Sequence, residues 1–532
     1  MRIKRCTWWG VRLLVIMLFL AGSARGQFTG NIQGTVEDQS GAVVAQAKVD
    51  LVNTVTQVSA STTTDASGSY RFLSLAPGSY KITVAAKGFS KSETSFTLET
   101  NENLNLSISL KVGAATESVV VTTEPPILNT AETRNQQTLQ AQELSTLPLA
   151  GRNMLSLISV APGVSGLGLA GGPGVASGTP GTGVDIFSTE TAADVSANGQ
   201  GTVANMWIID SLDVTSNIRQ GVLNLVPNPD VVQETNIQVN TFSSEYGRGS
   251  GLQTALTTKS GTDTFHGLAS DYFNYQSMYA KYSLPPGSSG SYSPFHSNNI
   301  SATIGGPIIP HHQFFFLFGV EPLRSSYSTG GVGLTFADPQ FAAWAQTNYP
   351  NTFGTKILTT YVPTHIVGTT VLKTANDIFP GRCGTAATNN LPCSTPMIDS
   401  GSFNATNFRN GTQYFVRVDK YLKNDRIYGS FFRTLLNYGG PAAIPQFSTT
   451  NNTWERGFQA NWTHTFSPTL LNEAVFAQNR IEGKQDETGD FTIPGISVTG
   501  QNLGYGLGFS QGDFIQHNYH WRDVLRSVAP TH

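Results

Sequence analysis

Charged residues are scarce in this sequence: Asp, Glu, Lys and Arg make up 13% of its 532 positions, against roughly 25% in an ordinary soluble domain. Uncharged polar residues and glycine are abundant instead. Strands built from such residues suit the lumen of a porous β-barrel or a secreted β protein. The composition therefore favours one of these two β-rich classes.

The sequence also lacks an apolar run long enough for a transmembrane helix. Its N-terminal apolar segment, residues 13–20, is well short of the roughly 20 residues that such a helix needs. Basic residues precede it and small residues follow it, which is the pattern of a secretory signal. We predict a signal peptide over residues 1–26, cleaved before Gln27. Any further embedding in a membrane must then use β-strands, because lipid leaves no other way to satisfy the backbone polar groups.

Positive charge is low in the mature chain. The formal net charge of the whole chain is -3, and loss of the five basic residues of the signal peptide lowers it to about -8. The residues that leave are Arg2, Lys4, Arg5, Arg12 and Arg25. Binding to nucleic acid depends on neutralising phosphates with Lys and Arg. We therefore expect no nucleic-acid partner.

Cysteine is almost absent, with three residues in the chain. Cys6 leaves with the signal peptide, so Cys383 and Cys393 remain, in a loop-like segment of an exported protein. In an oxidising compartment such a pair forms a disulfide, which we predict here. A metal or redox pair is the alternative, but the segment lacks a neighbouring histidine and the Cys-x-x-Cys spacing.

The segment after the signal peptide has the pattern of short strands separated by turns. Alternation with period 2 is typical of half-buried strands, and Asp-x-x-Gly and Ala-Pro-Gly sequences between the strands supply turns. The strand-like segments are residues 30–36, 47–52, 68–72, 79–84 and 104–110. We predict an all-β sandwich over residues 27–112.

This sandwich segment resembles the carboxypeptidase regulatory-like, or transthyretin-like, domain. The residues that carry the resemblance are Gly34, Val36, Asp38, Gly41, Ala47, Val49, Thr64, Asp65, Gly68, Tyr70, Leu75, Pro77, Gly78, Tyr80, Gly88 and Phe89. In metallocarboxypeptidases this module is the non-catalytic companion, and no histidine precedes His266 in this chain. The resemblance therefore implies no zinc site, and we expect no enzymatic activity, cofactor or metal.

A glycine-rich stretch at residues 241–251 carries a second resemblance. It contains Glu245, Tyr246, Gly247 and Arg248, and it is followed by a Lys-Ser-Gly-Thr turn and an aromatic, alternating segment. Glycines there permit positive φ and close backbone approach. The stretch resembles the end of the plug domain and the first barrel strand of Oar-like TonB-dependent outer-membrane transporters.

Further plug motifs stand upstream in the order that this family has. They include Gly151, Arg152, Asn153, Asn198, Gly199 and Asp210. The resemblance implies an α+β plug domain over residues 127–262. One departure is Ser211, which follows Asp210 where the family usually has glycine. We expect it to alter a local turn and to leave the fold unchanged.

The linker at residues 113–126 lies where TonB-dependent transporters carry the TonB box. A short extended apolar run can add as a strand to the edge of a partner's sheet. We interpret the following residues as the box: Glu117, Ser118, Val119, Val120, Val121 and Thr122. The alternative is that they form the last strand of the sandwich.

Residues 263–532 alternate like the first strands of an outer-membrane barrel. The three phenylalanines at 314–316, with Glu321 and Arg324, resemble the hairpin that opens the barrel in Oar-like proteins. The stretch 325–410 fits a long extracellular loop. Alternating segments lie near 267–276, 298–306, 312–320, 412–420, 425–434, 455–465 and 470–480. Because plugged transporters use roughly 22 strands, we expect this chain to be a fragment of a longer protein.

Catalytic or metal-binding groups are poorly assembled in the sequence. Asp210 and Asp213 are near neighbours, and His517 and His520 are three positions apart, but neither pair has further partners. Positions three apart on a strand face opposite sides, so the two histidines are poorly placed for one metal. We interpret both pairs as structural or exposed groups.

The predicted fold is mainly β: a signal peptide, a transthyretin-like sandwich, a plug domain and the N-terminal strands of a barrel. The resemblance implies a TonB-dependent transporter of the outer membrane, with sandwich and plug facing the periplasm and TonB as a partner. Glycans, peptides and metal chelates stay open as substrate classes. The alternative is a surface adhesion or structural protein, in which the sandwich binds a ligand and the barrel only anchors it.

Overall fold

A computed structural model describes residues 29–113, 118–121, 135–147, 152–169, 186–187, 193–218, 220–240, 242, 249–278, 295–467, 469–508 and 511–527. The predicted signal peptide lies outside these ranges. Among the described residues, no helix has the length and apolar character needed to cross a membrane. The described chain is mainly β, as predicted.

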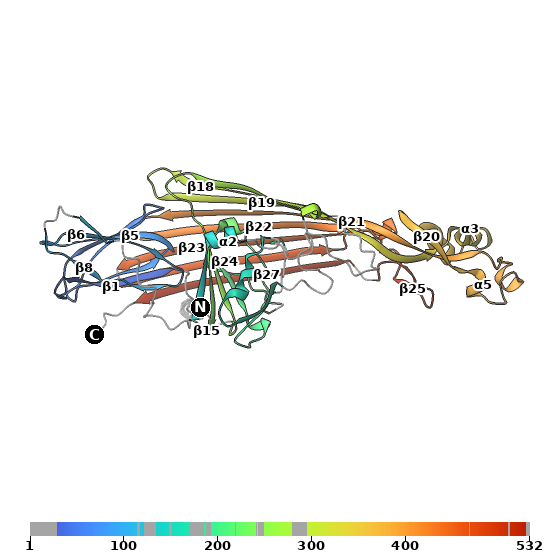
Figure 1. Cartoon of the computed structure of the whole chain (residues 1–532), viewed down its shortest axis with the longest axis horizontal. Coiled ribbons are helices and arrows are strands. Elements are labelled where there is room, and N and C mark those ends of the chain that lie inside the picture. The colour runs from blue at the N-terminus through green and yellow to red at the C-terminus, as the bar shows by residue number, and fades with distance from the viewer. Residues whose placement is uncertain are drawn as a thin grey trace, which may run out of the picture.

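Two packed sheets form the N-terminal sandwich, the part closest to the blue end of the colour scale (Figure 1). Alternate residues of its strands are buried because successive side chains of a strand point to opposite faces. One sheet contains β1 (Gly30–Asp38), β4 (Ser69–Leu75), β7 (Asn103–Asn105) and β8 (Ile108–Leu110). The other has the order β3 (Ser59–Thr63), β2 (Lys48–Asn53), β5 (Gly78–Ala85), β6 (Lys91–Leu98) and β9 (Ser118–Val121).

The plug is a small α+β unit around a five-stranded sheet. The sheet has the order β10 (Asn135–Gln140), β15 (Val232–Asn240), β16 (Gln253–Thr258), β13 (Met206–Ile209) and β14 (Leu212–Asp213). A hairpin of β11 (Val164–Leu169) and β12 (Ala193–Ala197) accompanies it. The helical elements are α2 (Ala141–Thr146) and the 3-10 helices η2 (Met154–Val160), η3 (Thr202–Ala204) and η4 (Pro229–Val231).

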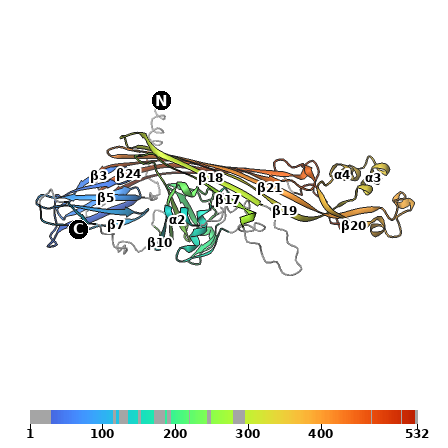
Figure 2. The same cartoon turned by 45° about the horizontal axis from the view of Figure 1, so that its top comes forward.

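A long antiparallel sheet, called the wall here, makes up most of the remaining chain. Its order is β17 (His266–Tyr275), β18 (Phe295–Ile309), β19 (Phe314–Ala337), β21 (Pro396–Tyr421), β22 (Asp425–Gly440), β23 (Thr449–Ser467), β24 (Leu470–Gln485) and β27 (Gly512–Ser527). Within the described ranges no pairing joins β17 to β27, so the wall is an open sheet. It arches over the plug, and the sandwich lies beyond one end of its strands (Figures 1 and 2).

The sequence did not predict β27. Its buried positions include polar residues such as Gln516, Asn518 and Arg522, and its exposed positions include Ile515 and Trp521. The usual alternation of apolar buried and polar exposed residues is therefore inverted along much of this strand. A strand prediction that looks for apolar residues on the buried face misses such an inverted pattern.

A small lobe lies at the end of the wall strands far from the sandwich (Figure 1). Our prediction of a long loop at 325–410 was wrong in its extent, because β19 and β21 pair in register as far as Ala337 and Ile398. The alternating residue pattern that predicts a strand is lost there, because the strands are no longer buried on one face and exposed on the other although their backbones remain paired. The lobe contains α3 (Pro339–Asn348), α4 (Phe353–Thr360), β20 (Ile366–Thr374), α5 (Ala375–Ile378), η6 (Ala386–Thr388), η7 (Pro445–Phe447), β25 (Ile496–Val498) and β26 (Leu503–Tyr505).

Candidate functional site

The face of the wall that meets the plug is mostly polar although it is buried, and a few apolar side chains, such as Phe415 and Phe432, pack there against the apolar core of the plug. The buried polar side chains of this face include Ser301, Glu321, Gln413, Arg417, Ser430, Gln459, Asn461, Asn479 and Asn518. Exposed apolar side chains occupy alternate positions on the other face, among them Val416, Phe431, Phe458, Trp462, Phe476 and Trp521. An apolar exterior around a polar interior is the pattern of an outer-membrane barrel, which has lipid outside and a polar lumen inside.

Asp210 is the centre of the first ion cluster between plug and wall. It ends the β13 strand in the left-handed region, with φ 52°. Its carboxylate accepts hydrogen bonds from the Thr258 amide at 2.9 Å and from the Thr258 hydroxyl at 2.7 Å. From the wall, Gln459 Nε2 donates to it at 3.0 Å and Arg417 Nη1 lies 3.3 Å away. The plug motif residue Asp210 therefore faces the wall.

Arg417 joins Asp210 to a second carboxylate on its own strand. Its Nε and Nη2 atoms donate to the two oxygens of Asp419 at 2.7 and 2.9 Å, a bidentate arrangement that suits the planar guanidinium. Its Nη1 also donates to the Thr258 hydroxyl at 2.8 Å. Burial raises the pKa of Asp210, and the charge of Arg417 opposes that rise. Arg426 of β22 lies 3.8 Å from the same Asp419. The cluster thus places Arg417 between two buried carboxylates and a second cation beside one of them.

Ser211, the departure from the family pattern, contacts the wall. Its backbone N–H donates to Gln459 Oε1 at 3.0 Å, and its hydroxyl lies 3.4 Å from the Tyr428 hydroxyl. A glycine could supply the first contact and not the second. In this chain, the turn after Asp210 therefore carries an additional polar contact to the wall.

Arg152 is the centre of the second ion cluster. Its Nη2 donates to Asp230 at 2.8 Å within the plug, and its Nη1 lies 3.2 Å from Glu321 of β19. The guanidinium also stacks 3.9 Å above the ring of Tyr272 on β17. Ser301 of β18 donates to the same Asp230 oxygen at 2.6 Å. Three neighbouring wall strands therefore meet this part of the plug.

Side-chain amides extend the contact between plug and wall. Gln413 of the wall accepts from the Asn228 amide at 2.6 Å and donates to the Val226 carbonyl at 2.8 Å. Asn224 donates to Asn479 at 3.0 Å, and Asn217 donates to Asn518 at 2.7 Å. Since these partners come from β21, β24 and β27, the polar seam crosses much of the wall.

The sandwich touches the underside of the plug through the loop after β6. The Thr100 amide donates to Glu234 Oε1 at 2.6 Å, and the hydroxyls of Thr100 and Thr257 lie 2.8 Å apart. Glu234 is 2% exposed. Burial raises the pKa of its carboxyl to about 7, while the hydrogen bonds from Thr100 act in the opposite direction.

Docking of the sandwich on the plug is expected to weaken as pH rises. Because the pKa of Glu234 is raised from 4.5 to about 7, the docked state holds the proton more tightly. Docking is therefore strongest below pH 4.5 and weakens as pH rises toward 7, since separation of the sandwich returns this carboxyl to water. Distances between spin labels on Val55→Cys and Val203→Cys, measured at pH 5 and pH 8, check this. The Glu234→Gln variant should show no such difference, and a preserved pH profile in it would contradict the assignment.

The remaining plug motif residues have local structural roles. Asn153 caps η2, with its side-chain oxygen accepting from the Leu155 amide at 3.1 Å. Asn198 has φ 50°, and its Nδ2 donates to the Val239 carbonyl at 2.6 Å. Gly199 follows it with φ 75°. Gly151, Glu245, Tyr246, Gly247 and Arg248 lie outside the described residues.

The predicted TonB box lies partly on the edge of the sandwich. Ser118–Val121 form β9, which pairs in parallel with β6. Glu117 and Thr122 lie outside the described residues. The structure therefore shows the strand that our alternative interpretation expected, at the position where the resemblance expects the box.

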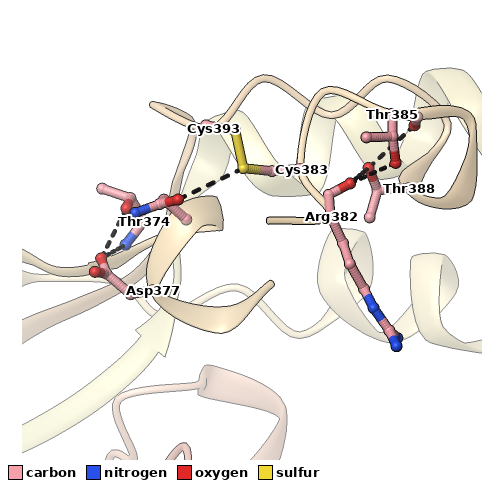
Figure 3. The surroundings of a disulfide bond; sticks show 8 residues. Thr374, Asp377, Arg382, Cys383, Thr385, Thr388 and Cys393 are labelled. Atoms are coloured by element: carbon pink, nitrogen blue, oxygen red, sulfur yellow. Dashed lines mark hydrogen bonds between the residues drawn. A yellow bond between two sulfur atoms is a disulfide. The ribbon is translucent and has the colours of Figure 1, made fainter. Parts of the chain in front are cut away.

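Cys383 and Cys393 are joined in the lobe, with their Cα atoms 5.0 Å apart (Figure 3). The Thr385 and Thr388 hydroxyls donate to the Arg382 carbonyl at 2.7 and 2.9 Å and fold the loop between the cysteines. Cys383 packs in a small apolar cluster with Ala375, Leu391, Met397 and Ile398.

Breaking the disulfide is expected to loosen the lobe and leave the wall intact. In the chain-entropy model, a bond that closes so short a loop contributes about 2 to 3 kcal/mol. Non-reducing peptide mapping should recover one linked pair. In the double variant Cys383→Ser/Cys393→Ser, hydrogen exchange should rise in α5 and stay unchanged in β22. Two free thiols in material from an oxidising compartment would contradict the prediction.

Groups that could perform catalysis or bind a metal are dispersed. Among the described residues, no group of three or more His, Cys, Asp or Glu side chains is placed to hold a metal ion. Asp213 accepts from the Thr215 amide at 2.9 Å. His517 is exposed on β27, and His520 lies on the opposite face of that strand.

The sequence missed the wall side of the first cluster, and it indicated Glu321 of the second only as part of a hairpin motif. Arg417, Asp419 and Gln459 were not singled out, although Arg417 and Asp419 flank Val418 with the spacing that puts both on one strand face. Two charged residues two positions apart, on the strand face opposite to the apolar one, could have indicated this side of the cluster. That pattern can be interpreted only when the sheet is known to cover a plug.

Comparison with known proteins agrees with this architecture. The model of the outer membrane beta barrel domain family matches residues 257–532, and that of the carboxypeptidase regulatory-like domain matches residues 31–111. The TonB-dependent transporter Oar of Myxococcus xanthus is 26% identical over 328 residues, which are 58% of this chain and 28% of that protein. The chain therefore spans little more than a quarter of that relative's length.

Two solved structures with low sequence identity cover a similar share of the chain. The siderophore receptor PirA from Acinetobacter baumannii has a TM-score of 0.39 at 10% identity, with 73% of this chain and 44% of that one covered. The ferric enterobactin receptor PfeA from Pseudomonas aeruginosa, as a double mutant, has a TM-score of 0.38 at 10% identity, with 72% and 44% covered.

The family matches confirm both resemblances that the sequence showed. The barrel match covers more than half of the chain and coincides with the wall, whose outer face is apolar and whose inner face is mostly polar. The chain belongs to the outer membrane beta barrel domain family and carries an N-terminal carboxypeptidase regulatory-like domain.

Proposed function

We propose that this chain belongs to a TonB-dependent transporter that takes up a substrate by displacing its plug. Its parts are a sandwich (27–112), a linker with the TonB box (113–126), a plug (127–262) and the first barrel strands (263–532). The observation that carries the proposal is the seating of the plug on a polar wall through two buried ion clusters. One surrounds Arg417, and the other surrounds Arg152.

The chemistry of the two clusters suits a plug that has to hold one position and also has to be released. Buried ion pairs add little net stability compared with apolar groups of similar size, but removing one partner is costly. Such contacts define a single seated position rather than simply strengthening the fold. Opening a path along the wall requires both clusters to break together, which calls for an external source of work.

TonB supplies that work in the proposed mechanism. The sandwich end of the wall faces the periplasm and the lobe faces the outside, where substrate first binds. TonB then engages the box and transmits energy from the proton gradient of the inner membrane to the plug. This protein breaks no bond of the substrate, so it acts as a transporter and not as an enzyme.

Replacing Val120 by Pro is expected to abolish binding of the TonB C-terminal domain. Proline removes a main-chain donor that strand addition needs. Pull-down with purified TonB domain checks this, with Thr123→Pro, just outside the box, as the matched control. Unchanged binding of the Val120→Pro protein would refute the box assignment.

Energy dependence separates transport from surface adhesion. A panel of glycans, peptides and metal chelates first identifies a substrate that supports growth of cells carrying the full-length protein. Uptake of that substrate should stop when the proton gradient is dissipated. Adhesion would persist under the same treatment. Persistence of the cellular phenotype without a gradient would therefore favour the adhesion alternative.

A further inference from the structure

The predicted TonB box is already paired with a sheet of its own chain. β9 is the fifth strand and the edge of the second sandwich sheet, next to β6. The parallel register matches Lys91 with Ser118, Ser92 with Val119, Glu93 with Val120, and Thr94 with Val121. The backbone of the four-residue strand is therefore engaged on one side by the sandwich.

Strand addition is also the mode by which a partner would bind the box. Such binding takes its affinity from main-chain hydrogen bonds along one edge of the added strand. In β9, the edge toward β6 has its groups occupied in the parallel ladder. TonB therefore competes with β6 if it needs that edge, or it adds to the outer edge of β9 if it does not.

We infer that the sandwich sequesters the TonB box as its own edge strand, and that TonB engages the box only after β9 has separated from β6. This inference rests on the proposed function, because it takes residues 117–122 as the box. The carboxypeptidase regulatory-like domain then acts as an autoinhibitory cover for the energy-coupling segment of the same chain.

The charge pattern of β6 supports a strand that is uncovered at times. Natural proteins protect exposed sheet edges with charged side chains. β6 carries Lys91 and Glu93 in the part that pairs with β9, and these two form an ion pair at 2.8 Å. Glu93 also lies 3.7 Å from Lys81 of β5. When β9 leaves, the new edge is therefore already charged.

The same strand links the box to the plug. β6 pairs with β9 at its start, and its end leads directly into Thr100, which bonds to Glu234 and Thr257 of the plug. The docking of the sandwich and the retention of the box are thus contacts of one continuous segment. A shift of the plug that breaks the Thr100 contacts acts on the strand that holds the box.

A reversible crosslink tests the inference. The variant Glu93→Cys/Val120→Cys places cysteines at paired register positions of β6 and β9. In the full chain, binding of the TonB C-terminal domain is compared between the reduced and the oxidised form of this one variant, so that the substitution within the box is the same in both measurements. Oxidation should weaken the binding by about a hundredfold, which corresponds to about 2.7 kcal/mol. Each single-cysteine variant, oxidised and reduced identically, controls for effects on the native disulfide.

The outcomes separate this inference from the proposed function. Equal binding by the oxidised and reduced double variants overturns the inference and leaves the box assignment standing. No binding by the wild type overturns the box assignment itself, and the inference with it. If the wild type binds and the reduced variant does not, Val120 itself contributes to binding, and hydrogen exchange in the wild type decides the inference. Loss of binding on oxidation that reverses on reduction supports both.

Hydrogen exchange gives a second measurement that needs no crosslink. If TonB strips β9 from β6, addition of the TonB domain should raise exchange at those backbone amides of residues 91–94 that point toward β9, while the alternate amides, which point toward β5, stay protected. If TonB adds to the outer edge of β9, the amides that point toward β9 stay protected as well and the inference is overturned. The amides of β1, in the opposite sheet, serve as the internal control.

Discussion

Replacing Arg417 by Met is expected to loosen the plug from the wall by about 3 to 5 kcal/mol, because the buried carboxylate of Asp210 then loses its ion-pair partner on the wall, while Asp419 keeps Arg426 at 3.8 Å. Asp210 and Asp419 both lie within hydrogen-bonding or ion-pair distance of this guanidinium, and both are buried. Hydrogen exchange in β13 and β16, which frame Asp210, measures the loss directly. Their exchange should accelerate while that of the sandwich strand β5 stays constant.

Arg433→Met is the matched control for Arg417→Met. Arg433 lies on β22, next to the strand of Arg417, and its side chain is exposed. Removing this cation should change plug stability by no more than about 0.5 kcal/mol. If Arg417→Met behaves like the control, the cluster does not hold the plug.

A double variant separates the effect of an unpaired charge from the effect of the ion pair between plug and wall. Asp210→Asn combined with Arg417→Met removes both members of that pair and leaves Asp419 with Arg426, 3.8 Å away. Because a buried ion pair can be replaced by neutral groups at little cost, most of the lost stability should return. The plug would then be held stably against the wall without the charges that define its position.

The architecture of the wall could be predicted from the sequence wherever burial is one-sided. Segments such as 425–434 and 455–465 alternate because one face meets the plug and the other lies at the outer surface. The predictions fell short at the strand ends, and β22 and β23 extend beyond those segments to Gly440 and from Thr449. Backbone pairing continues there although few positions, such as Leu436 and Thr453, are buried, so the alternating residue pattern is too short to show it.

The clusters show why only half of the site could be predicted. Asp210 and Arg152 were recognised through plug motifs, but their wall partners Arg417 and Glu321 lie more than 160 residues away in sequence. The topology brings each pair together by arching the wall over the plug (Figure 2). Local sequence carries no record of such a pairing.

Two interpretations of residues 118–121 could not be separated from the sequence for a different reason. An extended apolar run has the same pattern whether it pairs with a sheet of its own chain or binds to the sheet of a partner. In the structure, residues 118–121 pair with β6. That observation describes the resting position of the segment and leaves its proposed role as the box to the binding experiments.

Replacing Arg152 by Met is expected to destabilise the seated plug by about 3 to 5 kcal/mol as well, since Asp230 and Glu321 would remain buried without their cation. Tyr272→Leu is the matched variant, because it removes the stacked ring and leaves both ion pairs in place. It should cost about 0.5 to 2 kcal/mol. Equal effects of the two variants on exchange in β15 would show that the ion pairs contribute nothing beyond packing.

The two clusters should also be coupled, because adjacent residues of the plug belong to one each. Thr258 bonds to Asp210 and Arg417, while Lys259 donates to the Asp230 carbonyl at 2.9 Å. Once one cluster is broken, the end of β16 is free to shift and the other holds less. The double variant Arg152→Met/Arg417→Met should therefore cost less than the two single changes together, by about 0.5 to 3 kcal/mol. Strict additivity in the exchange of β16 would mean that the plug is held at two independent points, and that TonB would have to release them separately.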